Sequence, residues 1–352
     1  MADPHRMRMH WLDAMRGLTM LLVVAYHVAV FTFGQNEKTS SSLPFLVLLR
    51  MPLFFFVSGF LAYRPRFDWH PSSVGRTLWR KTQVQVVPAL LFLCLCLVFR
   101  QKGDFVVHLE QAFSQATKGG YWFTWVLLQL FVIYYVVLAL LPVRLHHRAS
   151  CLLWLFSVAA YETSYMPRLL TYPSSPFFQW TSLVLTIRYM QFFMLGNLVA
   201  RHRAVFRWMI TRRWFFPLVV GVAVLCCADL FRWHTLHRMW TNLPRTVAMY
   251  ALLAIVVTAF FHYRQTWAGH NWPSRALRYV GTRTLDIYLL HFLLLPALPM
   301  VGKWVNSHHP GFLAEVLLDV GMAVPVVAAC CLVSHLLRVS PVFTFHLFGR
   351  RT

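Results

Sequence analysis

Apolar runs of about 20 residues recur along almost the whole chain, and short polar loops separate them. A helix needs a run of that length to cross the hydrocarbon core of a bilayer. The pattern therefore predicts an all-α fold, a polytopic membrane helix bundle with about ten transmembrane helices. The predicted spans are 12–33, 44–63, 84–100, 121–141, 150–166, 176–200, 214–231, 243–263, 283–301 and 312–336.

Arginine and lysine are concentrated in alternate loops of this pattern. Because cytoplasmic loops of membrane proteins are enriched in these residues, the bias predicts that both termini are cytoplasmic. The same bias explains the net charge of +22 without a nucleic-acid partner. The chain has 352 residues, 58% of them apolar and only 12% charged, so we expect one integral membrane domain over residues 1–352.

The first span carries three ionisable residues, Asp13, Arg16 and His27, on an otherwise apolar helix. Ten residues separate Arg16 from His27, which places both side chains on one helix face, roughly 16 Å apart along the axis. Asp13 precedes Arg16 by three residues and can pair with it. Ionisable groups are costly inside a span, so we expect these three to belong to a functional site.

Polar residues also interrupt the second and sixth spans. Arg50 lies two residues before a proline, and Ser58 lies directly before a glycine, which predicts a kinked helix with room for a close neighbour or a ligand. Arg188 and Gln191 share one helix face in the sixth span. We expect these residues to bind substrate. For Arg50, a structural pair with a buried carboxylate is the alternative.

The ninth span places Tyr288 and His291 three residues apart, with Asp286 nearer its cytoplasmic end. A second histidine therefore lies near the middle of the membrane. Packing through a hydrogen bond would explain one such histidine, but two with polar neighbours favour a buried polar site. We expect Tyr288 and His291 to contact substrate there.

The loop between the second and third spans is strongly basic and offers Arg76, Arg80 and Lys81. Guanidinium and ammonium groups bind phosphate, so these residues could receive a phosphate-bearing cytosolic donor. A topology signal combined with contact to anionic lipids would explain the same charges.

Four motifs in this chain resemble the acyltransferase-3 family. They are Leu-Asp-x-x-Arg-Gly followed by His27, Arg-Met-Pro-Leu-Phe-Phe-Phe-Val-Ser-Gly-Phe from Arg50, Gln-Phe-Phe-x-Leu-Gly from Gln191, and Ile-Tyr-Leu-Leu-His ending at His291. The resemblance implies a multi-pass membrane enzyme that acylates cell-envelope sugars. It implies that His27 is the catalytic base, that Arg16 is essential beside it and that Arg50 belongs to the site. Gln85 departs from the pattern, since family members usually carry arginine there.

The chemistry of acyl transfer agrees with this resemblance. A neutral histidine can take the proton of an acceptor hydroxyl, and Arg50, Arg188 or Tyr288 could stabilise the oxyanion. We expect acyl-CoA as the donor substrate and an envelope glycan or lipid-linked sugar as the acceptor, at the inner cell membrane. Acetyl is the commonest acyl group in the family, and succinyl is the alternative.

Neither a tightly bound cofactor nor a metal site is expected, because the seven cysteines lack metal-site spacing. A transporter or flippase that uses the same buried charges for a glycan or lipid is the alternative function.

Overall fold

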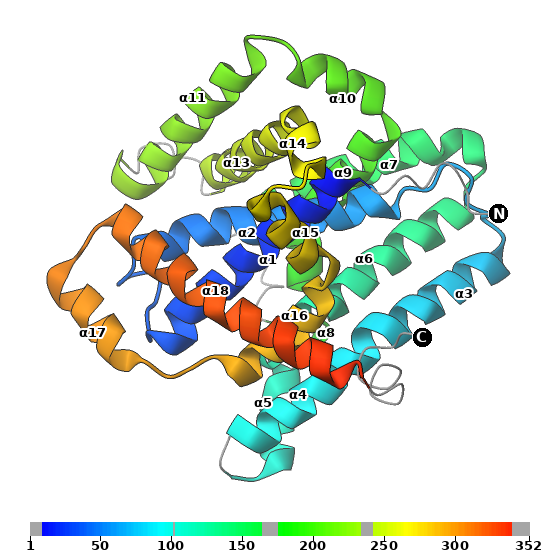
Figure 1. Ribbon diagram of the computed structural model, residues 1–352. Helices are drawn as coiled ribbons and strands as arrows, with labels where there is room; N and C mark the ends of the chain where they lie inside the picture. Colours follow the sequence, from blue (N-terminus) through cyan, green and yellow to red (C-terminus); the bar gives the residue numbers. More distant parts are fainter. Residues whose placement is uncertain (1–8, 101–102, 164–174, 234–241, 340–352) are drawn as a thin grey trace. The chain divides into compact units, whose positions relative to one another are not determined.

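The computed structural model describes residues 9–100, 103–163, 175–233 and 242–339, and those ranges contain helices and loops but no strand (Figure 1). The all-α prediction is confirmed. Both chain ends lie outside these ranges, so their cytoplasmic placement stays a prediction. In chain order the helices are α1 (His10–His27), η1 (Val28–Thr32), α2 (Ser42–Ala62), α3 (Pro71–Lys81), η2 (Thr82–Val86), α4 (Val87–Arg100), α5 (Phe105–Ser114), η3 (Lys118–Gly120), α6 (Trp122–Ala139), η4 (Val143–Leu145), α7 (His146–Thr163), α8 (Pro176–Thr181), α9 (Leu183–Arg201), α10 (Arg203–Ile210), α11 (Phe215–Ala228), η6 (Asp229–Trp233), α13 (Leu243–His262), α14 (Arg264–Ala268), α15 (Trp272–Thr282), α16 (Thr284–Leu294), α17 (Pro299–His308) and α18 (Phe312–Leu337).

In the described residues, seven helices are long and apolar enough to cross a membrane, and up to nine if each of two bent helix pairs forms one span. The seven are His10–Thr32, Ser42–Ala62, Pro71–Phe99, Trp122–Ala139, Leu183–Arg201, Leu243–His262 and Phe312–Leu337. Helix α7 matches the predicted fifth span but is not among them. The protein is thus a polytopic helical membrane protein, and the count of ten stays a prediction.

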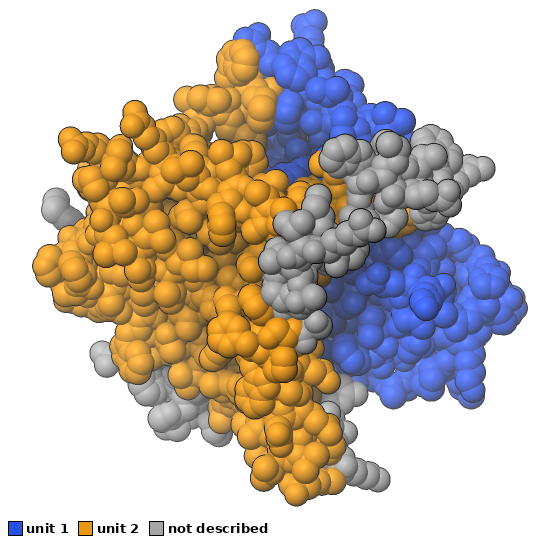
Figure 2. All heavy atoms as spheres, turned by 180° about the vertical axis from the view of Figure 1, so that it is seen from behind, with its two compact units in different colours: residues 1–54, 210–225, 247–333 blue, residues 55–209, 226–246, 334–352 orange. Residues whose placement is uncertain are grey.

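The chain divides into two compact units, which Figure 2 distinguishes by colour. Unit 1 comprises residues 1–54, 210–225 and 247–333, and unit 2 comprises residues 55–209, 226–246 and 334–352. The prediction of a single membrane domain stays a prediction.

Helices α1 and α15 of unit 1 cross at two glycines. A Cβ atom added to Gly17 would lie 2.0 Å from the Leu277 carbonyl oxygen, and one added to Gly281 would lie 1.8 Å from that of Asp13. No side chain fits at either position, so the two backbones are in direct contact, as in other small-residue crossings of membrane helices. Helix α16 begins two residues after α15 ends, so the crossing also fixes the position at which α16 starts.

Helix α1 does not continue as an α-helix to residue 33. After His27 the backbone widens into the π-helix η1, which ends at Thr32. The Thr32 carbonyl accepts a hydrogen bond of 2.8 Å from the Leu298 backbone N–H, so a carbonyl near the end of the span has a partner in the protein. Gly302 of α17 lies against the Phe33 carbonyl, where an added Cβ would come within 1.8 Å.

The predicted ninth span, 283–301, is two helices rather than one. Helix α16 ends at Leu294, and α17, which begins at Pro299, is bent from it by 89°. Pro296 lacks a backbone N–H and pushes the preceding residue out of the helical region. Leu295 accordingly has extended backbone angles, with ψ at 120°.

The start of α2 is held by a carboxylate of α18. Glu315 Oε2 accepts hydrogen bonds from Ser40 Oγ (2.8 Å), Ser41 N (2.7 Å) and Ser42 N (3.2 Å), and Ser42 Oγ donates to Asp319 at 2.5 Å. Unpaired N–H groups and the helix dipole make a helix N-terminus favourable for a carboxylate. Glu315 and Asp319 therefore have a structural role, and they fix the end of the helix that carries Arg50.

In unit 2, helices α2 and α9 cross in the same way. A Cβ on Gly59 would lie 1.8 Å from the Phe193 carbonyl oxygen, and one on Gly196 would lie 2.0 Å from that of Phe56. The close neighbour expected beside Ser58 is thus α9. Helix α2 is one continuous helix with Pro52 inside it.

Candidate active site

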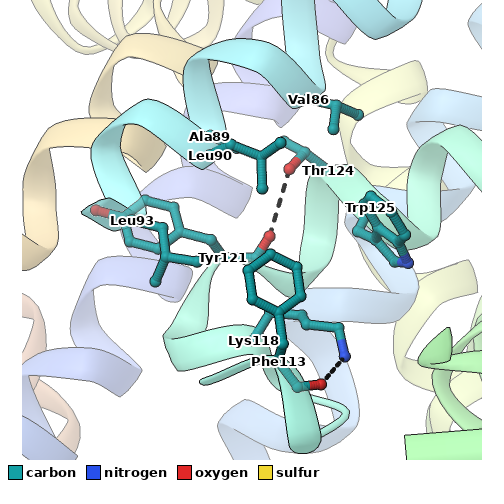
Figure 3. Close-up of a pocket in the computed structure, with 9 residues that line it drawn as sticks. All are labelled: Val86, Ala89, Leu90, Leu93, Phe113, Lys118, Tyr121, Thr124 and Trp125. Carbon is teal, nitrogen blue, oxygen red and sulfur yellow. Dashed lines mark hydrogen bonds between the residues drawn. The ribbon is translucent and has the colours of Figure 1, made fainter. Parts of the chain in front are cut away.

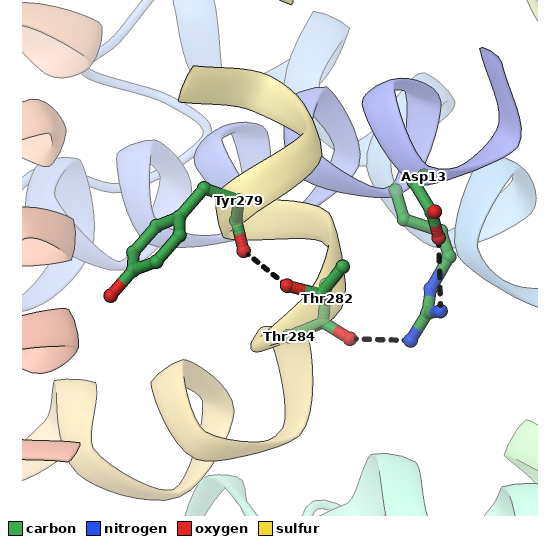
Figure 4. A network of polar contacts seen from close by, with 5 residues as sticks. Asp13, Tyr279, Thr282 and Thr284 are labelled. Carbon is green, nitrogen blue, oxygen red and sulfur yellow. Dashed lines mark hydrogen bonds and ion pairs between the residues drawn. The ribbon is translucent and has the colours of Figure 1, made fainter. Parts of the chain in front are cut away.

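Asp13 lies on α1 close to the junction of α15 and α16 (Figure 4), and Arg16 follows it on the same helix. Arg16 Nη2 donates to Thr284 Oγ1 at 2.9 Å, and Arg16 Nη1 lies 3.9 Å from Asp13 Oδ1. The predicted i,i+3 pair therefore forms. The Arg16 side chain is 30% exposed, so solvent screening leaves the ion pair weak and the guanidinium accessible to a ligand.

His27 and His291 contact each other directly inside unit 1. His27 Nδ1 and His291 Nε2 are 2.8 Å apart, and the rings are nearly parallel, with centroids 4.9 Å apart. His291 Nδ1 lies 3.1 Å from the Ile287 carbonyl oxygen, one turn earlier in α16. His291 is completely buried, whereas 8% of His27 is exposed. The sequence indicated two buried histidines, but nothing in their spacing indicated this contact.

Aromatic rings and one more cation surround the two histidines. Phe292 stands 4.8 Å from His27 and 4.1 Å from His291, measured between ring centroids. The Arg50 guanidinium carbon lies 3.5 Å from the centre of the Tyr26 ring, next to His27 in sequence. Arg50 is 8% exposed, so its charge is held by an aromatic face rather than by bulk water.

Arg16 and His27 both reach α16, through Thr284 and His291 respectively. The prediction that they share one face of α1 is therefore confirmed. Tyr288, also on α16, is 4% exposed, and its ring centroid lies 5.9 Å from that of His291. Five of the predicted site residues of unit 1 thus contact one another or Thr284 around α1 and α16: Asp13, Arg16, His27, Tyr288 and His291.

The sequence matches a family profile described as "Acyltransferase domain" over residues 9–335. The chain belongs to the acyltransferase-3 family. It is a multi-pass membrane acyltransferase. No curated protein and no solved structure matches it.

The remaining predicted substrate-binding residues of this acyltransferase lie in unit 2. Gln191 is completely buried, and its amide nitrogen donates to the Arg188 backbone carbonyl at 3.1 Å. Arg188 and Ser58 are half-buried. The contact between Arg188 and Gln191 follows their predicted spacing, but the substrate-binding role of all three residues stays a prediction.

The predicted donor-binding residues lie on α3 of the acyltransferase. His70 caps the start of this helix, since its side chain accepts from the Ser72 N–H at 3.4 Å. Asp68 accepts hydrogen bonds from Ser73 Oγ (2.5 Å) and the His70 N–H (3.1 Å). The bond from Ser73 lowers the pKa of Asp68. Arg76 and Arg80 are exposed.

Lys81 is placed differently from the two exposed arginines. Its ammonium lies 3.2 Å from the centre of the buried Phe131 ring. Arg76 and Arg80 are thus accessible to an anionic ligand, while Lys81 takes part in packing. Gln85, which stands where the family usually has arginine, is half-buried.

A small hollow in unit 2 was not foreseen (Figure 3). Residues of η2, α4, α5, η3 and α6, with Tyr121 between the last two, line it, and most of them are apolar: Val86, Ala89, Leu90, Leu93, Phe113, Lys118, Tyr121, Thr124 and Trp125. The Lys118 ammonium donates to the carbonyls of Phe113 (2.7 Å), Gln115 (3.0 Å) and Gln179 (3.0 Å). Burial lowers the pKa of Lys118 to about 8. Because all three of its N–H groups are used by carbonyls, Lys118 joins these loops and has no donor left for a ligand.

Proposed function

We propose that this membrane acyltransferase moves an acyl group, most simply acetyl, from cytosolic acyl-CoA to a hydroxyl of a cell-envelope sugar or polysaccharide precursor at the inner membrane. One observation carries the proposal. The His27 imidazole, of which 8% is exposed, touches the fully buried imidazole of His291, within the unit that also holds the cations Arg16 and Arg50. Ester formation from a thioester requires a base that can accept a proton near neutral pH. It also requires fixed positive charge to stabilise the oxyanion.

In the proposed reaction His27 takes the proton of the acceptor hydroxyl as its oxygen attacks the thioester carbonyl. The carbon–oxygen ester bond forms, the carbon–sulfur bond breaks, and the proton passes from His27 to the leaving thiolate. The Arg50 guanidinium, which lies over the Tyr26 ring, would stabilise the oxyanion. Arg16, eleven residues earlier on α1, would hold an anionic part of the donor nearer the cytoplasm.

Arg76 and Arg80 support the donor part of the proposal. Both are exposed on α3, and both lie in the loop predicted to be cytoplasmic. Guanidinium groups bind phosphates through paired N–H donors, so they suit the nucleotide end of acyl-CoA.

The test uses purified protein in liposomes, supplied with acetyl-CoA or succinyl-CoA and an envelope glycan fraction. Free thiol should appear only when donor and acceptor are both present, and mass spectrometry should find the acyl ester on the glycan. Uptake of labelled glycan without thiol release would instead identify a transporter and would refute the proposal.

A further inference from the structure

Two successive hydrogen bonds run from His27 to the backbone of α16. The first joins His27 Nδ1 to His291 Nε2 at 2.8 Å, and the second joins His291 Nδ1 to the Ile287 carbonyl at 3.1 Å. A carbonyl oxygen can only accept, so the proton of the second bond belongs to His291 Nδ1. The helix therefore determines where the protons lie in both bonds.

The proton positions follow one from another when both rings are neutral, as a general base must be. With its proton on Nδ1, His291 presents a lone pair at Nε2. His27 must then donate from Nδ1, and the lone pair of its own ring lies on Nε2. Within the described residues, His27 makes no other hydrogen bond, so Nε2 has no competing donor.

The difference in burial separates the roles of the two histidines. His291 is 0% exposed and has hydrogen bonds at both ring nitrogens, so it cannot reach a substrate. His27 is 8% exposed and has one nitrogen without a bond. The ring of Phe292 packs against both imidazoles and limits their rotation.

We propose that His291 is a positioning residue, not a substrate ligand: it holds His27 in the tautomer with the proton on Nδ1, so that Nε2 takes the hydroxyl proton. This inference rests on the proposed function in naming His27 as the base. It replaces the substrate-binding role that the sequence assigned to His291. In the other tautomer, His27 would present an N–H to the hydroxyl and could not act as a base.

The decisive comparison is between His291→Phe and His291→Gln. Phenylalanine keeps a ring beside Phe292 but has no acceptor, whereas the glutamine oxygen can accept from His27 Nδ1. The expected loss in kcat is about 100-fold for His291→Phe and under about tenfold for His291→Gln, with KM for acyl-CoA within about threefold of wild type in both.

His146→Phe is the matched control. His146 is also buried, at 2% exposure, and its Nε2 lies 3.0 Å from the Leu141 carbonyl oxygen. Its replacement removes a similar histidine–carbonyl contact elsewhere, so it should affect stability but leave kcat within about twofold of wild type. The proposal would be overturned if kcat fell equally in His291→Phe and His291→Gln, or if His291→Phe kept the wild-type kcat.

A second readout does not depend on turnover. NMR of protein with ¹⁵N-labelled imidazoles should show His27 protonated on Nδ1 in the wild type and in His291→Gln, and a mixture of tautomers in His291→Phe. An unchanged His27 tautomer in His291→Phe would overturn the inference. Absence of acyl transfer in the wild type with the expected tautomers would instead refute the proposed function alone.

Discussion

The two glycine crossings use the same backbone contact and surround it with different side chains. In unit 1, Gly17 and Gly281 bring α1 against α15, and the neighbouring Arg16 bonds to Thr284. In unit 2, Gly59 and Gly196 bring α2 against α9, and the carbonyls they meet belong to phenylalanines. The glycines of the family motifs thus allow two helices to pack closely in both units. The side chains beside each crossing determine whether it could take part in acyl transfer.

The side chains near the second crossing form an aromatic stack. Phe55 stacks on Tyr189 with centroids 4.8 Å apart, and Tyr189 stacks on Trp122 at 5.4 Å. Such contacts stabilise a helix bundle but supply no proton acceptor. We therefore propose the reaction centre in the α1–α15–α16 region and interpret the glycine contact of α2 with α9 as packing, while the substrate-binding role of Ser58, Arg188 and Gln191 stays a prediction.

The largest expected effect on stability is at the crossings themselves. Gly281→Ala places a Cβ 1.8 Å from a carbonyl oxygen, and Gly196→Ala places one at 2.0 Å. Both substitutions force the crossing helices apart. Each should lose at least about 2 kcal/mol of stability and much of the folded yield, measured by thermal unfolding in detergent.

Each unit offers a control for this prediction. An added Cβ meets nothing within 4 Å at Gly221 of unit 1 or at Gly75 of unit 2. Gly221→Ala and Gly75→Ala should therefore unfold at nearly the wild-type temperature. If Gly281→Ala were as stable as Gly221→Ala, the direct backbone contact would be wrong.

Arg16→Gln tests whether unit 1 holds the reaction centre. Removing the charge should lower kcat/KM about 100-fold, because a fixed cation near the donor is lost. Thr284→Val removes the hydroxyl that accepts from Arg16, and it should cost only a few-fold. Steady-state kinetics in liposomes measure both. Equal activity of Arg16→Gln and wild type would remove Arg16 from the mechanism.

A smaller effect is expected on α3 of unit 2. The double variant Arg76→Gln/Arg80→Gln should raise KM for acyl-CoA about five- to tenfold and leave kcat unchanged, because exposed cations contribute modestly and are screened by salt. The difference from wild type should shrink in high salt. Arg213→Gln, another exposed arginine in a loop predicted to be cytoplasmic, should leave KM unchanged. A fall in kcat without a change in KM would contradict a donor-binding role.

The smallest expected effect on activity concerns Lys118, which the structure assigns to loop packing. Lys118→Met leaves three carbonyls without their donor and should destabilise the protein by about 1–3 kcal/mol. Thermal unfolding measures the loss, while kcat should stay at the wild-type value. A selective loss of activity with normal stability would indicate a ligand role instead.

The sequence was sufficient for the parts that depend on helical periodicity. Apolar runs predicted helices, and the spacing of Arg16 and His27 predicted a shared face, which their bonds to α16 confirm. Spacing within one helix also predicted the Asp13–Arg16 pair.

Features that depend on contacts between distant segments could not be predicted in the same way. The pairing of His27 with His291 is set by the register in which α16 follows the Gly17–Gly281 crossing, and no local pattern specifies that register. The π-helix after His27 has no sequence signature either. The break after Leu294 did have one, the prolines at 296 and 299, but the apolar run concealed it.

The central claim is that the His27 imidazole accepts the proton of the acceptor hydroxyl. The most direct test measures acceptor-dependent thiol release from acyl-CoA by His27→Ala in liposomes, together with its thermal unfolding. We predict an unfolding temperature close to that of the wild type and a loss of transfer of about 1,000-fold. Transfer within about tenfold of the wild-type rate, in a protein that is folded, would contradict the account.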